Sequence, residues 1–167
     1  MLKGIDPRLN ASVLYALRSM GHGDLVVVAD ANFPADSIAR DTIYGELLRM
    51  ETPTAAEAVE AILSVLPLDN GHDYAARMQV ADDPDEVPPV HAEVQALLDP
   101  GAEEPRPMMG LARFDFYDAA RQAYALIQTG ERRFYGCFML RKGVLPPPAF
   151  RGPVAEAMLD EDTDPTL

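Results

Sequence analysis

Residues 20–34 read Met-Gly-His-Gly-Asp-Leu-Val-Val-Val-Ala-Asp-Ala-Asn-Phe-Pro, and this stretch decides the fold class. Its continuous apolar run, Leu25–Ala29, is rich in β-branched residues and is typical of a strand covered on both faces. Before it, the apolar residues of segment 12–20 have the spacing of an amphipathic helix. After it, the Asn-Phe-Pro at 32–34 interrupts regular structure. A helix followed by a doubly covered strand indicates an α/β protein.

Two titratable residues frame this strand. His22 lies between Gly21 and Gly23 before the strand, and Asp30 follows the strand at once. Imidazole exchanges protons readily near neutral pH, and flanking glycines allow another group to approach the ring closely. The pattern predicts a proton-transfer site containing His22 and Asp30. The alternative is a histidine in a solvent-exposed turn, with Asp30 capping the segment after the strand.

The same alternation of helix and strand continues along the chain. Thr52-Pro53-Thr54 opens a second amphipathic helix, with either threonine as the cap, and Pro67 ends it. Shorter patterns predict strands at 75–81, 110–114, 124–128 and 135–141, and helices at 90–98 and 116–123. We therefore expect an α/β fold, with one compact domain over residues 1–148 and a central sheet flanked by helices. Residues 149–167 are acidic and low in aromatic residues, which predicts a mobile tail.

Composition narrows the class of partner. The 167 residues carry a net charge of −13, which repels nucleic-acid phosphates and anionic membranes. No apolar run is long enough to span a bilayer, and the N-terminal segment has no apolar signal core. A single cysteine, Cys137, excludes an internal disulfide. We expect a cytoplasmic protein that binds neither nucleic acid nor membrane.

The sequence lacks the motifs of several common metal, nucleophile and cofactor sites. The three histidines do not form the close pairs typical of zinc sites, and the acidic segment at 82–86 lacks the spacing of a calcium loop. Nucleophile elbows and glycine-rich phosphate loops are also absent. We therefore predict no metal and no nucleotide cofactor. Neither His72 nor His91 lies between two glycines ahead of an apolar run as His22 does, and both are expected at the surface. Cys137 is expected to be a small buried apolar residue.

A second polar and aromatic cluster lies near the C-terminus. Arg113-Phe114-Asp115-Phe116-Tyr117 is followed by the segment 129–137, Thr-Gly-Glu-Arg-Arg-Phe-Tyr-Gly-Cys. Guanidinium donors bind hydroxyl oxygens and aromatic rings cover the C–H faces of sugars, so the cluster is compatible with a sugar site. The competing interpretation places Phe114, Phe116 and Tyr124 in the core and the arginines in solvent.

Taken together, these segments resemble the L-fucose mutarotase and ribose pyranase family (RbsD/FucU), most closely its fucose branch. The resemblance covers about residues 1–145, in order. It is carried by Leu2-Lys3-Gly4-Ile5, Met20-Gly21-His22-Gly23-Asp24, Asp30-Ala31-Asn32-Phe33-Pro34, Leu66-Pro67-Leu68-Asp69, Arg113-Phe114-Asp115-Phe116-Tyr117, Thr129-Gly130-Glu131, Tyr135-Gly136 and Leu140-Arg141-Lys142-Gly143-Val144.

The resemblance implies a sugar isomerase without metal or cofactor. It implies that His22 is the catalytic proton donor, and that Asp30, Arg113 and the run Tyr135-Gly136-Cys137 bind a monosaccharide substrate. It also implies a homo-oligomer with the site near a subunit contact. The function expected is interconversion of the anomers of L-fucose or a related sugar; the alternatives are a ribose-type pyranase and a non-catalytic sugar-binding or regulatory protein.

Two departures from the family pattern bear on the substrate. Cys137 stands where the family usually has asparagine, so a carboxamide is replaced by a weak thiol donor. Arg49-Met50-Glu51-Thr52 replaces the family's Arg-Ala-Asp-Gly before the second helix. Both changes bear on which sugar is bound more than on the class of reaction.

Overall fold

The computed structural model describes the chain except for residues 1, 99, 101–105, 146 and 148–167, so the expected tail at 149–167 lies outside the described residues. The elements, in chain order, are α1 (Ala11–Ser19), β1 (Leu25–Ala29), α2 (Ala35–Ala39), β2 (Leu47–Arg49), α3 (Ala55–Leu63), β3 (Ala75–Met78), α4 (Pro89–Leu98), β4 (Met109–Leu111), α5 (Arg113–Arg121), β5 (Ala125–Gln128) and β6 (Phe138–Arg141). In this described part, no helix has the length and apolar character needed to cross a membrane.

The strands form one mixed sheet around β1. Its six strands lie in the order β2-β5-β1-β6-β3-β4, and β6 runs antiparallel to both of its neighbours while the other pairs are parallel. Five strands therefore point the same way, and their carboxyl ends share one edge of the sheet. Strands β5 and β6 follow each other in sequence but are separated by β1 in the sheet.

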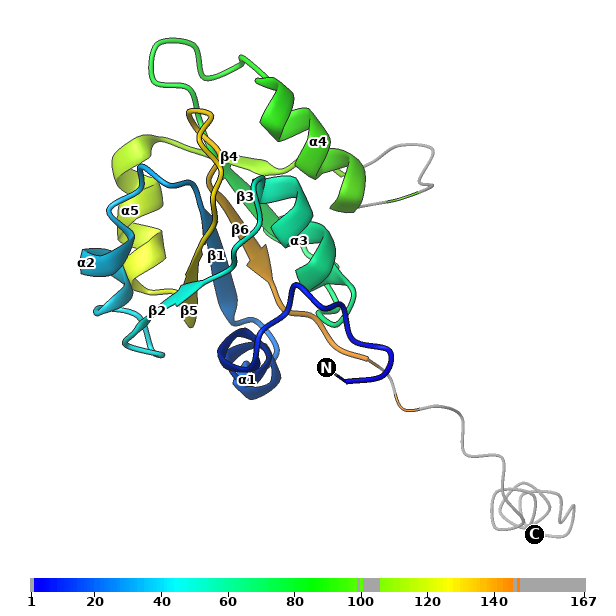
Figure 1. Cartoon of the computed structure of the whole chain (residues 1–167). Coiled ribbons are helices and arrows are strands. Elements are labelled where there is room, and N and C mark those ends of the chain that lie inside the picture. Colours follow the sequence, from blue (N-terminus) through cyan, green and yellow to red (C-terminus); the bar gives the residue numbers. More distant parts are fainter. Residues whose placement is uncertain (1, 99, 101–105, 146, 148–167) are drawn as a thin grey trace, which may run out of the picture.

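Helices cover both faces of the sheet (Figure 1). Because side chains alternate along a strand, Val26 and Val28 pack with α1, α3 and α4 on one face. Val27 and Ala29 pack with α2 and α5 on the other face. The doubly covered strand and the α/β fold expected from the apolar run are thus confirmed.

The other helices and strands expected from the sequence are present, but their first or last residues differ from the expected ones. Side chains that accept a backbone N–H begin two helices: Asn10 caps α1, and Thr54 forms a capping box with Glu57 on α3. The short elements α2 and β2 were not expected. The strand expected at 110–114 is shorter, because Arg113 and Phe114 already belong to α5, where Phe116 N–H donates to Ala112 O. The strand expected at 135–141 is also shorter, because β6 begins at Phe138.

The turn that carries His22 is fixed at the amino end of β1. The Lys142 ammonium donates to the carbonyl oxygens of Leu17 and Met20 at 2.8 and 2.6 Å, which satisfies the carboxyl end of α1. The amide of Gly23 donates to the carbonyl oxygen of Lys142 at 2.8 Å. The backbone around His22 is therefore held by the chain just after β6.

Candidate functional site

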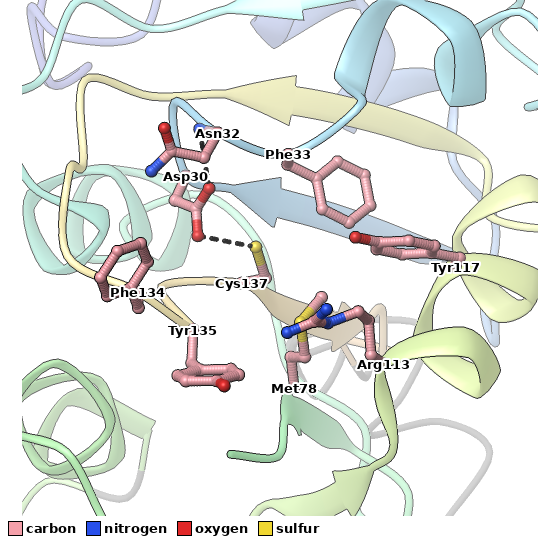
Figure 2. Close-up of a pocket in the computed structure, with 9 residues that line it drawn as sticks. All are labelled: Asp30, Asn32, Phe33, Met78, Arg113, Tyr117, Phe134, Tyr135 and Cys137. Carbon is pink, nitrogen blue, oxygen red and sulfur yellow. Dashed lines mark hydrogen bonds between the residues drawn. The ribbon is translucent and has the colours of Figure 1, made fainter. Parts of the chain in front are cut away.

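A pocket opens at the carboxyl edge of the five parallel strands, the usual position of ligand sites in open α/β sheets. It has a volume of about 200 Å³, below the range of about 300–1,000 Å³ that is typical for drug-sized ligands. Its lining comes from the chain after β1, from β3, from α5 and from the segment before β6 (Figure 2): Asp30, Asn32, Phe33, Met78, Arg113, Tyr117, Phe134, Tyr135 and Cys137. The size suits a single monosaccharide ring.

Asp30 presents a fixed carboxylate in this pocket. It is buried, and its Oδ1 accepts a hydrogen bond from the amide of Asn32 at 2.9 Å. Its Oδ2 accepts from the Cys137 thiol, with 3.4 Å between sulfur and oxygen (Figure 2). Burial, together with the Asp30 charge, raises the pKa of Cys137 well above its usual value. The thiol therefore stays protonated and serves as a hydrogen-bond donor, not as a nucleophile.

Arg113 lines the pocket from the first turn of α5. Within the described residues its guanidinium makes no hydrogen bond or ion pair, so its N–H donors are available to a ligand. Nearby, the rings of Phe33 and Tyr117 pack edge to face with centroids 5.2 Å apart. Phe116 is in the core as the competing interpretation expected, but Phe114 is 75% exposed and is not.

Glu131 anchors the segment that delivers Tyr135 and Cys137. Its side chain is only 3% exposed, and its oxygens accept from the amides of Ala55, Arg132 and Arg133 at 2.9–3.1 Å. Burial raises its pKa, but the hydrogen bonds and charge of Arg133 and the bond from the Ala55 amide prevail and lower the pKa to about 2. This carboxylate was expected only as part of a turn motif; its role as an anchor depends on the distant start of α3.

The sugar-binding run expected at 135–137 adopts an unusual backbone. Tyr135 has a φ of 62°, in the left-handed region that non-glycine residues rarely occupy. At Gly136, a Cβ atom would lie 2.6 Å from Cγ of Glu131, so only glycine fits. The Tyr135 hydroxyl accepts from the amide of Ala81 at 3.3 Å. The turn is thus built by a tight backbone approach to Glu131.

His91 corrects one expectation, because this histidine is fully buried and not at the surface. Its position on α4 aims the ring at the sheet, where Nε2 lies 2.9 Å from the carbonyl oxygen of Tyr135. No local sequence frame marks this residue, since its partners lie on β3 and before β6. His72, by contrast, is exposed as expected.

His22 does not enter the pocket of its own chain. It precedes β1 whereas Asp30 follows β1, and a five-residue strand spans about 16 Å. Its imidazole is 60% exposed, with Nε2 at 3.4 Å from Oδ1 of Asp69. The amide of Asn70, with a smaller contribution from His22, lowers the pKa of Asp69. The prediction that His22 and Asp30 of the same chain form one proton-transfer site is therefore wrong. The other candidate residues, Asp30, Arg113, Tyr135, Gly136 and Cys137, are brought together.

Comparison with known proteins places this geometry in a family. The model of the RbsD / FucU transport protein family matches residues 3–145. Human fucose mutarotase is 40% identical over 149 residues, which are 86% of this chain and 94% of that protein. The structure of protein Atu2016 is 54% identical, with a TM-score of 0.83 over 87% of this chain and 97% of the other.

A further solved structure is the fucose mutarotase from Streptococcus pneumoniae in complex with L-fucose. It is 32% identical, has a TM-score of 0.77, and covers 87% of this chain and all of its own length (100%). The family match, the sequence identities and the similarity of the folds agree with one another. This chain belongs to the RbsD/FucU family.

Proposed function

We propose that this protein is a mutarotase that interconverts the anomers of L-fucose or a closely related monosaccharide. The observation that carries the proposal is a pocket of about 200 Å³ that combines a fixed carboxylate, a guanidinium without a partner among the described residues, and a tyrosine hydroxyl. Such a set of acceptors and donors matches the hydroxyls of one sugar ring. The fucose mutarotase relatives, one of them solved with L-fucose, support the reaction class and the sugar.

Mutarotation requires two balanced proton movements. One group gives a proton to the ring oxygen and another removes the proton of the anomeric hydroxyl, while the C1–O5 bond breaks. The resulting aldehyde rotates about the C1–C2 bond, and reclosure on its other face returns both protons. Positioned acids and bases each contribute roughly 10²–10⁴-fold to such a step. Asp30 and Arg113 would hold the hydroxyls, Tyr135 would bind a hydroxyl or take part in proton transfer, and His22 would be the proton donor.

We further propose that a second copy of the chain supplies His22. Among the residues that line the pocket there is no imidazole, whereas His22 is exposed at the opposite end of β1. Each end also exposes apolar side chains. Phe114 and Phe134 are 75% and 78% exposed near the pocket, and Val144 and Leu145, close to the His22 turn, are 61% and 77% exposed.

Contact between these two unlike ends would be head to tail. A head-to-tail contact uses different surfaces on the two copies and closes into a ring when the rotation permits. It would cover both apolar ends and bring the imidazole of one copy to the pocket of the next. A homo-oligomer located in the cytoplasm, without nucleic-acid or membrane partners, agrees with the charge and composition of the chain.

The test is anomer exchange measured by saturation-transfer NMR. We expect the protein to accelerate exchange of L-fucose more than the pyranose–furanose exchange of D-ribose, and His22→Ala to lower the rate at least tenfold. His72→Ala, at the exposed histidine, is the matched control and should leave the rate unchanged. Faster exchange of D-ribose would favour a pyranase, and sugar binding without accelerated exchange would indicate a binding protein.

A further inference from the structure

We propose that His91 is a positioning residue that holds Tyr135 in its sugar-binding conformation. The inference rests on the proposed role of Tyr135 and adds a residue to that site. His91 lies in the first turns of α4, is fully buried, and places Nε2 at 2.9 Å from the carbonyl oxygen of Tyr135. His91 does not itself line the pocket, and it reaches the site through the backbone of Tyr135, which does.

The two hydrogen-bond partners of the His91 ring determine which of its nitrogens carries the proton. A carbonyl oxygen only accepts, so Nε2 of His91 must carry the hydrogen that is donated to Tyr135. On the other side, a guanidinium nitrogen of Arg77 lies 3.3 Å from Nδ1, and since arginine only donates, Nδ1 must be the acceptor. His91 is therefore neutral with its proton on Nε2. Burial chiefly, and the Arg77 charge in addition, lower the pKa of His91 and favour this form.

The backbone of Tyr135 requires such support. A φ of 62° places its Cβ close to the following carbonyl, which is unfavourable for an L-residue with a side chain. Strained residues persist where the surroundings over-determine them, and they gather at binding sites. Here the His91 bond fixes the carbonyl, the Ala81 amide fixes the phenol, and the contact of Gly136 with Glu131 fixes the next residue. His91 thus links α4 and β3 to the pocket.

Two substitutions separate positioning from simple filling of space. His91→Leu replaces the imidazole with an apolar side chain of similar bulk and leaves the Tyr135 carbonyl without its donor. His91→Gln keeps an N–H for that carbonyl and an oxygen for Arg77. We expect His91→Leu to raise the KM for L-fucose about tenfold with a smaller change in kcat, as for loss of a buried hydrogen-bond partner. We expect His91→Gln to restore most of the affinity.

The controls keep the outcome decisive. His72→Leu removes the exposed histidine and should match the parent protein, and thermal unfolding shows whether each variant folds. A folded His91→Leu variant with the parent's KM would overturn the inference, as would equal losses in both variants. A ¹⁵N spectrum of His91 that shows Nδ1 protonated at neutral pH would also overturn it, even if no variant folds. Failure of the proposed function would instead appear as a parent protein without accelerated exchange.

Discussion

Replacing Glu131 with glutamine removes the charge on which the sugar-binding turn is built. The carboxylate is 3% exposed and accepts from the Ala55, Arg132 and Arg133 amides and from the Arg133 guanidinium. A glutamine of the same shape would turn an NH₂ group toward some of these donors, and no acceptor would remain for them. The structure therefore allows the cost of this substitution to be worked out.

The shift in the pKa of Glu131 gives the size of the expected loss in the free energy of unfolding. The pKa of Glu131 falls from 4.5 to about 2 on folding, which corresponds to about 3 kcal/mol of stability. Because the folded pKa is the lower one, this stability is fully present above pH 4.5 and is lost as the pH falls toward about 2. We expect Glu131→Gln to lower the free energy of unfolding by up to about 3 kcal/mol at pH 7, and the deficit to shrink on acidification.

Urea unfolding at several pH values between 7 and 2.5 measures both effects. Glu86→Gln, at an exposed glutamate, is the matched control and should change stability by less than about 0.5 kcal/mol. A Glu131→Gln protein as stable as the parent at pH 7 would refute the reasoning. A deficit that stays constant as the pH falls would refute the electrostatic origin while leaving a packing role.

Three further substitutions probe the pocket and its supports. Gly136→Ala places a Cβ 2.6 Å from Cγ of Glu131 and should displace the turn, which we expect to weaken L-fucose binding at least tenfold in NMR titrations. Arg113→Ala removes the guanidinium from the pocket, and the KM for L-fucose should rise about tenfold or more. Thr54→Ala removes the cap that accepts from the Glu57 amide and should cost about 1 kcal/mol in urea unfolding, with the KM unchanged.

Each of these has an outcome that contradicts it. Parent-like affinity in Gly136→Ala would mean that the close approach to Glu131 is not needed for binding. An unchanged KM in Arg113→Ala would remove the guanidinium from the sugar contacts. A large change of KM in Thr54→Ala, with little loss of stability, would assign the cap a part in the site that its hydrogen bonds do not explain.

The sequence predicts those elements whose signal is local. The helix at α1, the strand β1 and the helix α3 each have an apolar period or run together with a cap, a glycine or a proline at the end. The elements α2 and β2 have five and three residues, too few to show a period. Their conformation is set by packing against the sheet, which the sequence pattern does not display.

The residues of the site also divide into those that the sequence reveals and those that only the fold reveals. Asp30, Arg113 and Tyr135 are recognised by motif, and the fold brings them to one pocket. His22 is close to Asp30 in sequence, but the segment between them is mostly extended strand, so the two residues lie at opposite ends of β1. His91 has no local signal at all, since its partners are set by the docking of α4 on the sheet.

Cys137 shows how a departure from the family pattern can be absorbed. Its thiol is buried and donates to Asp30, so in this chain the residue contacts the carboxylate from the wall of the pocket. In this chain the thiol therefore both supports the Asp30 carboxylate and forms part of the pocket wall.

The most direct test of a shared site is to mix two inactive variants. His22→Ala loses the imidazole and keeps the pocket, whereas Asp30→Asn loses the pocket carboxylate and keeps the imidazole. When equal amounts are unfolded and reassembled together, about a quarter of the contacts in a head-to-tail ring should unite an intact pocket with an intact His22. We expect L-fucose exchange to recover to about that fraction of the parent rate. Exchange no faster than that of the two variants assembled separately would contradict a site completed by a second copy.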